Sequence, residues 1–496
     1  MIVQDSNEEN IYNEGEIIRD ATVLSSTLYI SQAFYIIRGF LIAQLLGPSS
    51  YGIWSVIRTF LNSAPYFGLG TQQAMLREVP FSTGEGDKLK KSSLIQTSLS
   101  WNVLISAIVM SLVLIASFFG FAAEYRFEIR LSGLLFMLTS VHLFMQPKFN
   151  SEQKYLLMSK YLLSYAILNT VLGLSLLFFF KLSGLLMGMI LAQLILLTYL
   201  IINKHLSLNL SINKEILKEL FKIGFPIMIL WFIIFLIGNL NKLIVFIMLG
   251  KTKAGFYGLA AFVSAIVGYI SYAATSVIFP RMMYTYGKTG EKKHMEKYFM
   301  KPMIVLSGFI PIILGIIYIN IEAIINLFLP QYIPGITVLH ILIASLFFST
   351  ILGLPVHLLI ALNKQKKFMY ITAIILFLSI ILDLVIIKLG FDINGVAIVT
   401  TFTFFLTSVL ANGYSLFLFK DGYRQILRKL SFIFMPFLYS FAGMIFIVSI
   451  SFSGNIFLEN ILQSLLFIVF NIPLIIYIEK ESKIINKILS LLKASK

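Results

Sequence analysis

The chain has 496 residues, of which 58% are hydrophobic and only 12% charged, with a formal net charge of +16 and no cysteine. Soluble domains carry about 25% charged residues, so this composition excludes an ordinary soluble protein and indicates that most of the chain faces lipid. The lack of cysteine excludes disulfides, thiolate metal sites and a cysteine nucleophile. The polar, acidic first 20 residues do not resemble a cleaved signal peptide, so we expect the first membrane helix to be retained.

Apolar runs of about 20 residues, separated by turns or charges, predict an all-α integral membrane protein with fourteen transmembrane helices. The runs cover residues 22–46, 53–76, 93–119, 131–149, 161–180, 184–203, 223–249, 256–279, 302–319, 337–361, 368–388, 395–419, 430–452 and 461–478. The fifth and sixth runs are separated only by the short stretch Lys-Leu-Ser-Gly at 181–184.

The positions of lysine and arginine predict the orientation of these helices. If both termini are cytoplasmic, 30 of the 39 cationic residues fall on the cytoplasmic side, six fall on the outer side, and three lie within spans. Cytoplasmic loops of membrane proteins carry an excess of Lys and Arg, so this distribution favours the assumed orientation. It also accounts for the net charge without a nucleic-acid partner.

An internal repeat organises the predicted helices. The segment "LLGPSSYGIW" at 45–54 resembles "MLGKTKAGFY" at 248–257, with Gly47 and Gly52 matching Gly250 and Gly255 at an offset of 203 residues. The same offset relates Gly84 to Gly287, although glycine-containing turns can also coincide by chance. Because six helices is an even number, the copies share one orientation, as in transporters with two parallel lobes around a substrate site.

The repeat predicts a pseudo-twofold pair of six-helix lobes followed by two further helices. The expected divisions are a cytoplasmic tail (1–21), an N-lobe (22–205), an amphipathic cytoplasmic linker (206–222), a C-lobe (223–425), helices 13 and 14 (426–480) and a second cytoplasmic tail (481–496).

Three cations lie inside the predicted spans. Arg38 lies about 13 Å below the outer turn at Gly47, Lys242 lies at nearly the same depth in the second lobe, and Arg58 lies about 9 Å down its helix. Charges at such depth cost several kcal/mol unless they are paired or face water, so they usually face a bundle interior or cavity. Snorkelling of Arg58 to the interface is the alternative.

Polar neighbours on the same helix faces support the cavity interpretation. Tyr35 accompanies Arg38, Asn62 follows Arg58 by one turn, and Asn239 precedes Lys242 by three residues. Few carboxylates are available to pair with these cations, which predicts an anionic ligand. Arginine suits a phosphate or pyrophosphate because its guanidinium forks around two oxygens.

Other residues in the spans have more open interpretations. Asp383 is a candidate for coupling transport to H⁺ or Na⁺, and it equally suits a pair with Lys388 or a hydrogen bond within the bundle. Pro65, Pro226 and Pro355 are candidate hinges, with close helix packing as the alternative. The histidines lack metal-ligand spacing and no phosphate-binding loop is present, so no metal or cofactor is expected.

The segments "LIAQLLGPSSYGIWSV" and "GLGTQQAMLREVP", followed by a glycine-rich basic loop, resemble the opening of the Wzx-type polysaccharide flippases. These belong to the multidrug/oligosaccharidyl-lipid/polysaccharide (MOP) exporter superfamily. The resemblance is dense over residues 25–95. It rests on the elements Leu46–Gly52 and Gly68–Gly70.

The resemblance implies an alternating-access flippase for polyprenyl-pyrophosphate-linked oligosaccharides, such as O-antigen units, in a bacterial or archaeal cytoplasmic membrane. It implies no enzymatic activity. It also implies that Arg38, Arg58 and Lys242 attract the pyrophosphate, with membrane lipid, glycosyltransferases or a polymerase as partners.

Two other functions stay open. An ion-coupled exporter of drugs or metabolites is disfavoured because relatives of that kind use a carboxylate in helix 1, and residues 22–46 contain none. A membrane glycosyltransferase or ligase would require a catalytic carboxylate or a long outer loop. The longest outer stretches, about 120–130 and 320–336, are short and lack paired acids.

Overall fold

The structure, a computed structural model, describes residues 14–119, 123–206, 209–263, 278, 282, 292–420 and 422–482. Within these ranges every regular element is a helix and none is a strand, as predicted. Helices satisfy their backbone hydrogen bonds internally, which is what a chain surrounded by lipid requires.

Most predicted spans coincide with helices. Ten helical segments are long and apolar enough to cross a membrane, and Ile456–Phe470 with Ile472–Glu481 forms a further span bent by 41°. Two of the ten, Val23–Phe67 and Tyr155–Ile202, each contain two predicted spans separated by a residue with non-helical dihedral angles. Thirteen of the fourteen predicted spans are thereby accounted for, and the remaining one, 256–279, lies largely outside the described residues.

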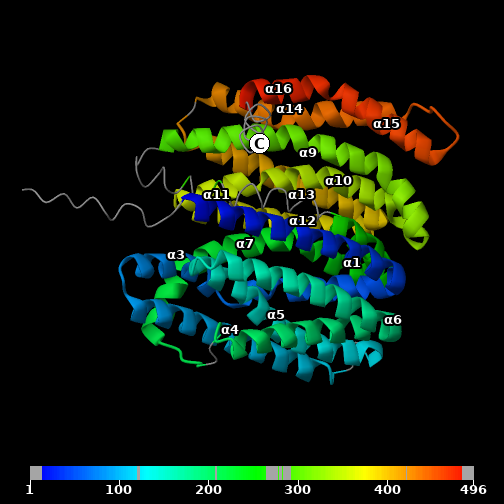
Figure 1. The fold of residues 1–496 in the computed structure, drawn as a ribbon. Coiled ribbons are helices and arrows are strands. Elements are labelled where there is room, and N and C mark those ends of the chain that lie inside the picture. Colours follow the sequence, from blue (N-terminus) through cyan, green and yellow to red (C-terminus); the bar gives the residue numbers. More distant parts are fainter. Residues whose placement is uncertain are drawn as a thin grey trace, which may run out of the picture. The chain divides into compact units, whose positions relative to one another are not determined.

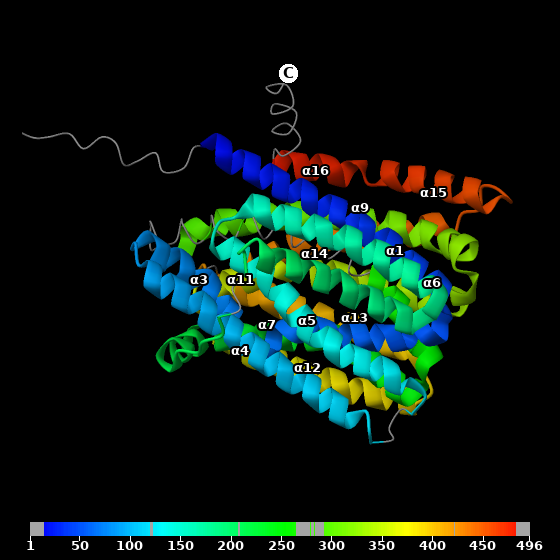
Figure 2. The same cartoon turned by 60° about the horizontal axis from the view of Figure 1, so that its bottom comes forward.

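The chain forms two compact units. The first comprises the chain up to Leu46 together with Ile57–Ile229. Its helices are most of α1 (Glu14–Asn62), α2 (Ala64–Phe67), α3 (Thr71–Gly84), α4 (Lys88–Ala116), α5 (Arg126–Ser151), α6 (Tyr155–Ile202) and the first part of α7 (Lys214–Leu249), with a 3₁₀ turn at Ala123–Tyr125. Helix α5 packs against both α4 and α6 (Figure 1 and Figure 2).

The second unit comprises Gly47–Val56 together with Leu230–Lys496. Besides the rest of α7, its helices are α9 (Lys292–Phe328), α10 (Ile336–Ile351), α11 (Gly353–Ala361), α12 (Gln365–Lys388), α13 (Asp392–Phe417), α14 (Tyr423–Val448), α15 (Ile456–Phe470) and α16 (Ile472–Ser482). Residues 251–263 are also helical, and a 3₁₀ helix covers Pro330–Gly335. Helices α14, α15 and α16 pack on α9 (Figure 1).

Breaks in the helices separate or interrupt the described spans at several residues. Gly47 (φ 67°) separates the halves of α1, and Lys181 (φ 51°) separates the halves of α6, where the sequence predicts the boundary between the fifth and sixth spans. The predicted second span, 53–76, is not one continuous helix. It breaks at Ser63 and again at 68–70, where Leu69 and Gly70 both adopt positive φ.

The repeated glycine motifs contact one another inside the second unit. A Cβ placed on Gly52 would lie 1.9 Å from the carbonyl oxygen of Lys251, and one on Gly255 would lie 1.9 Å from the carbonyl oxygen of Pro48. Pro48 and Lys251 are themselves related by the 203-residue offset, so the contact is reciprocal. Such reciprocity is what a twofold axis between equivalent segments produces, and it gives the predicted repeat a structural basis.

The amphipathic segment predicted before the seventh span is continuous with that span. Asn213 accepts hydrogen bonds from the N–H groups of Glu215 and Ile216, and α7 then runs unbroken from Lys214 to Leu249. Its first turns dock on α4, where Phe221 packs edge-on against Trp101 with ring centroids 5.2 Å apart. Leu220 is fully buried, as expected for the apolar side of this helix.

Candidate functional site

Arg38 is a buried cation without a protein hydrogen-bond partner for two of its nitrogens. Its side chain lies in α1 and the residue is 8% exposed. Nε and Nη2 are both inaccessible and make no hydrogen bond within the described part of the chain. The groups that interact electrostatically with this guanidinium are Tyr165, Arg58 and Tyr35, and none of them is a carboxylate. A buried charge in this condition requires an additional partner or a different conformation.

Helix α6 presents a polar stripe to Arg38. A Cβ placed on Gly173 would lie 3.6 Å from Nε and 3.8 Å from Nη2 of Arg38, so the guanidinium packs directly over this glycine. Asn169 and Tyr165 precede Gly173 by four and eight residues and therefore share its helix face. The Oδ1 atom of Asn169, the hydroxyl of Thr170 and the hydroxyl of Ser31 are also buried without a hydrogen-bond partner.

A second layer of polar side chains holds Tyr165. Gln193 donates from Nε2 to the hydroxyl of Tyr165 (3.2 Å) and to the hydroxyl of Thr139 (3.0 Å). The ring of His142 lies over Tyr165 with centroids 3.6 Å apart, and its Nδ1 is 2.6 Å from the hydroxyl of Tyr161. His142 is thus a packed, hydrogen-bonded histidine.

The other predicted site residues of the first unit differ in how far their side chains are buried. Tyr35 and Arg58 are half-buried and lie within electrostatic range of Arg38, so the structure brings these three together. Asn62 is the last residue of α1 and is exposed.

In the second unit the buried counterpart of Arg38 is Asn241, its repeat equivalent. Asn241 is 1% exposed and donates to the hydroxyl of Thr400, which also lies 2.7 Å from the hydroxyl of Tyr257. Lys242 is half-buried, and its Nζ donates to Oδ1 of Asn239 at 2.8 Å. The local pair of Lys242 and Asn239 therefore exists, while the convergence of Lys242 with Arg38 and Arg58 stays a prediction.

Asp383 is fully buried in α12 and neither carboxylate oxygen has a hydrogen-bond partner among the described residues. Ser379, one turn earlier, also has an unpartnered hydroxyl. Lys388 is exposed, and no ion pair joins it to Asp383 in the described ranges. Tyr257 lies within electrostatic range of this carboxylate.

The three predicted hinge prolines differ in their surroundings. Pro65 lies in the first turn of α2, directly after the break at Ser63. Pro355 lies in the first turn of α11, after the break between α10 and α11. Pro226 lies inside the unbroken helix α7. Two of the three prolines thus follow a helix break, and their role in movement stays a prediction.

A cavity of about 570 Å³ lies in the second unit and contains none of the predicted site residues. It is bordered by α9, α10, α13 and α14, and its lining includes Tyr318, His340, Phe348 and Phe405. Within the described ranges no group of three or more His, Asp or Glu side chains is arranged to hold a metal ion.

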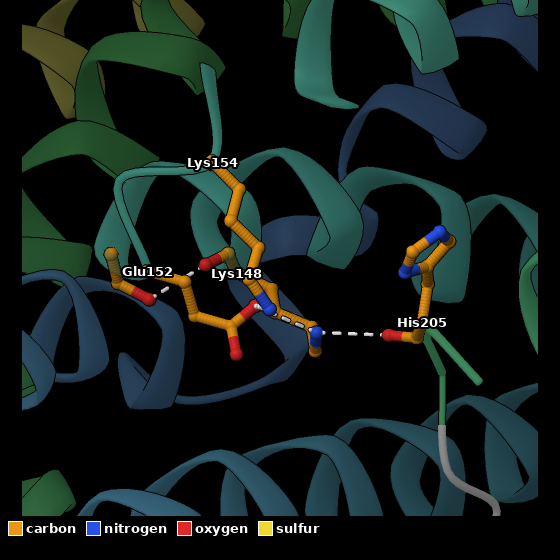
Figure 3. A network of polar contacts seen from close by, with 5 residues as sticks. Lys148, Glu152, Lys154 and His205 are labelled. Atoms are coloured by element: carbon orange, nitrogen blue, oxygen red, sulfur yellow. Dashed lines mark hydrogen bonds and ion pairs between the residues drawn. The ribbon is translucent and has the colours of Figure 1, made fainter. Parts of the chain in front are cut away.

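A polar network closes one end of α5 and α6 in the first unit (Figure 3). Lys148 Nζ donates to Glu152 Oε2 (2.9 Å) and to the carbonyl oxygen of His205 (3.0 Å), and Lys154 Nζ lies 3.4 Å from the same carboxylate oxygen. Burial raises the pKa of Glu152, but the two ammonium groups outweigh it and lower the pKa below its usual value. Through these contacts the network connects the turn after α6, which contains His205, to the turn between α5 and α6, which contains Glu152 and Lys154.

A model of a family described as polysaccharide biosynthesis proteins matches residues 41–337, more than half of the chain. The chain belongs to this family. The match includes Arg58, Lys242 and the repeated glycine motifs. No curated protein sequence matches the chain.

Solved structures share the fold of this polysaccharide biosynthesis protein. The lipid II flippase MurJ in an inward closed conformation gives a TM-score of 0.68 at 16% identity, covering 92% of this chain and 99% of that chain. An outward-facing multidrug resistance MATE transporter of the MOP superfamily gives 0.60 at 14% identity, with coverages of 82% and 95%. A MOP superfamily transporter from Pyrococcus furiosus gives 0.57, with the same identity and coverages. The two-lobed, all-helical fold predicted from the apolar runs and the internal repeat is confirmed.

Several residues of the polar clusters were not predicted. In the first unit they are Tyr165, which interacts electrostatically with Arg38, Asn169 on the same face of α6, and Gln193, which donates to Tyr165. In the second unit they are Thr400, which accepts from Asn241, and Tyr257, whose hydroxyl is 2.7 Å from that of Thr400. The spacing of Tyr165, Asn169 and Gly173 by four residues is visible in the sequence and marks one helix face. A search for polar stripes on apolar helices, in addition to charges, would have found them.

Proposed function

We propose that this protein is a flippase for polyprenyl-pyrophosphate-linked oligosaccharides, a transporter rather than an enzyme, serving cell-surface polysaccharide biosynthesis. It moves them from the inner to the outer leaflet of a bacterial or archaeal cytoplasmic membrane. The observation that carries the proposal is Arg38, a buried guanidinium with two unpartnered nitrogens in a polysaccharide biosynthesis protein. The likeness of the fold to a lipid II flippase supports it.

A transporter for such a substrate must replace the water that hydrates the pyrophosphate and the sugars. A pyrophosphate with attached sugars cannot cross about 30 Å of hydrocarbon, because its polar groups would lose their hydration. In the proposal, Arg38, Arg58 and Lys242 replace that hydration for the pyrophosphate. Tyr35, Asn62 and Asn239 add polar groups, and the lipid tail remains in the bilayer.

The cycle is alternating access between two lobes, 22–205 and 223–425. The tails 1–21 and 481–496 and the linker 206–222 face the cytoplasm, as the excess of Lys and Arg on that side favours. Pro65, Pro226 and Pro355 act as hinges. Repulsion among the cations keeps the chamber open, and the bound anion relieves it and permits closure.

Asp383 couples the cycle to H⁺ or Na⁺. Its carboxylate is fully buried with both oxygens unpartnered, and an unpaired carboxylate at such a position favours binding of a proton or small cation. We expect Asp383→Asn to abolish the dependence of transport on the ion gradient while leaving binding of the pyrophosphate within twofold of wild type. A variant that remains fully gradient-dependent would remove Asp383 from the proposal.

The function is tested in cells that lack the gene. Complementation with the wild-type gene is expected to restore the surface polysaccharide, whereas Arg38→Ala is expected to leave the lipid-linked oligosaccharide accumulated in the inner leaflet at normal expression. Arg38→Lys keeps the charge but not the forked geometry and should restore only part of the export. Full export by Arg38→Ala would contradict the proposal. The proposal would also be contradicted if the deletion strain exported its glycan normally and instead became sensitive to drugs or metabolites.

A further inference from the structure

We propose that Tyr165 and Asn169 on α6 complete, with Arg38 on α1, a subsite for one phosphate group of the transported pyrophosphate. The inference rests on the proposed function and adds two residues that were not predicted to take part. Gln193 and His142 serve as positioning residues behind Tyr165.

The charges around Arg38, Tyr165 and Asn169 favour binding of an anion. Arg38 is 8% exposed, Asn169 is 1% exposed and Tyr165 is 7% exposed, so all three belong to the interior of the first unit. The groups that interact with the charge of Arg38 include two tyrosines and a second arginine but no carboxylate. A phosphate oxyanion would satisfy the Nε and Nη2 hydrogens and neutralise the guanidinium.

Tyr165 is held so that its hydroxyl serves as a donor. Gln193 Nε2 donates to this hydroxyl at 3.2 Å, which occupies a lone pair of its oxygen. Its own hydrogen has no acceptor among the described residues. The ring of His142, 3.6 Å from the ring of Tyr165 and tilted by 31°, holds that ring and so the position of the hydroxyl oxygen. Tyr165 can therefore add a charge-assisted hydrogen bond to an anion on Arg38.

Asn169 lies between Tyr165 and Gly173 on the stripe that faces Arg38. Its Oδ1 has no partner, and the amide can exchange its oxygen and nitrogen by a half-turn, which presents an N–H donor instead. The unpartnered hydroxyls of Thr170 and Ser31 lie in the same interior. Gly173 allows close approach, because a Cβ at this position would already be in van der Waals contact with Nε and Nη2 of Arg38.

The subsite is closed in this conformation. Arg38 Nε and Nη2 are inaccessible, so a phosphate enters only when α1 and α6 separate. Binding is thus expected to favour a second conformation of the first unit. The closed form without an anion carries an unpaired buried charge, which disfavours it relative to a form in which an anion neutralises Arg38.

The test measures the Kd of inorganic pyrophosphate and of a polyprenyl pyrophosphate for the full chain in detergent. Tyr165→Phe keeps the ring stacked on His142 but removes the donor, so we expect at least tenfold weaker binding. Tyr161→Phe is the matched control, because among the described residues its hydroxyl bonds His142 and no other group. It should lower the Tm and leave the Kd within twofold of wild type.

Asn169→Asp provides the opposite experiment. A carboxylate at this position should pair with Arg38, raise the Tm and eliminate detectable pyrophosphate binding, and the higher Tm shows that the variant folds. If Tyr165→Phe and Asn169→Asp bind like wild type while Arg38→Ala does not, this inference falls and the proposed function stands. If Arg38→Ala also binds normally, both fall. Equal displacement by phosphatidylglycerol would overturn the assignment to the transported pyrophosphate.

Discussion

The buried cations of the first unit differ in whether the protein supplies them with hydrogen-bond and ion-pair partners. Lys148 and Glu152 have side chains that are 9% and 11% exposed, and each finds partners in the network around His205. Arg38 is buried to a similar degree and has unpartnered nitrogens. The contrast distinguishes a cation that is paired within the fold from one for which we propose a ligand as the partner.

The network around Glu152 predicts an acid-sensitive stability. Because the pKa of Glu152 is lowered in the folded protein, the unfolded chain binds more protons as the pH falls below about 4.5. The stabilisation by Glu152 is therefore present above this pH and is lost as the pH falls through the folded pKa. We expect Tm to drop across that window, and Glu152→Gln to flatten the drop.

At neutral pH, Glu152→Gln should destabilise the protein by about 3 kcal/mol, because Lys148 is left buried without a counter-charge. Glu85→Gln, at an exposed position, is the control and should change Tm little. An identical acid profile for wild type and Glu152→Gln would show that the network contributes nothing to the pH dependence.

Among the helices, segments 48–56 and 251–263 of the second unit approach each other closely where the repeated glycine motifs meet. Small residues at helix crossings in membranes allow backbones to touch and pack. Gly52 and Gly255 meet the carbonyl oxygens of Lys251 and Pro48 at distances that no Cβ tolerates.

We therefore expect Gly52→Ala and Gly255→Ala to destabilise the protein by about 1–3 kcal/mol each, since the helices must separate to admit a methyl group. Gly84→Ala is the matched control, because a Cβ there has no neighbour within 4 Å. Thermal melting in detergent measures the difference. Melting of Gly52→Ala at the wild-type temperature would show that the crossing does not contribute to stability.

The sequence was sufficient to predict most of the helical spans and one of their breaks, but not the other breaks or the rotation of each helix about its axis. Hydropathy located the fifth and sixth spans and the break at Lys181. Hydropathy predicted one continuous span over 53–76 and missed the breaks at Ser63 and at 68–70. The positive φ of Leu69 cannot be inferred from the apolar character of its side chain. The depth of Arg38 and Lys242 in the membrane stays a prediction. Their polar neighbours predicted that both face an interior, but not that Arg38 is buried and Lys242 only half-buried, because rotation about the helix axis depends on packing with neighbouring helices.

For the whole molecule, the cysteine-free chain permits a direct test of alternating access. A Cβ on Gly258 would lie 2.7 Å from the Cβ of Ser55, its repeat equivalent, and disulfides require about 3.5–4.5 Å, so slight separation suffices. In the double variant Ser55→Cys with Gly258→Cys, oxidation is expected to hold the crossing closed and stop transport, and a reductant should restore it. Each single variant is the control. Full transport by the oxidised double variant would contradict a cycle that opens this crossing.

The central claim is that a guanidinium in the first span receives the pyrophosphate. The most direct measurement is the rate at which purified protein in proteoliposomes moves a labelled polyprenyl-pyrophosphate oligosaccharide between leaflets. The account predicts transport by the wild type, a rate at least tenfold lower for Arg38→Ala, and an intermediate rate for Arg38→Lys. An Arg38→Ala rate equal to that of the wild type would contradict it.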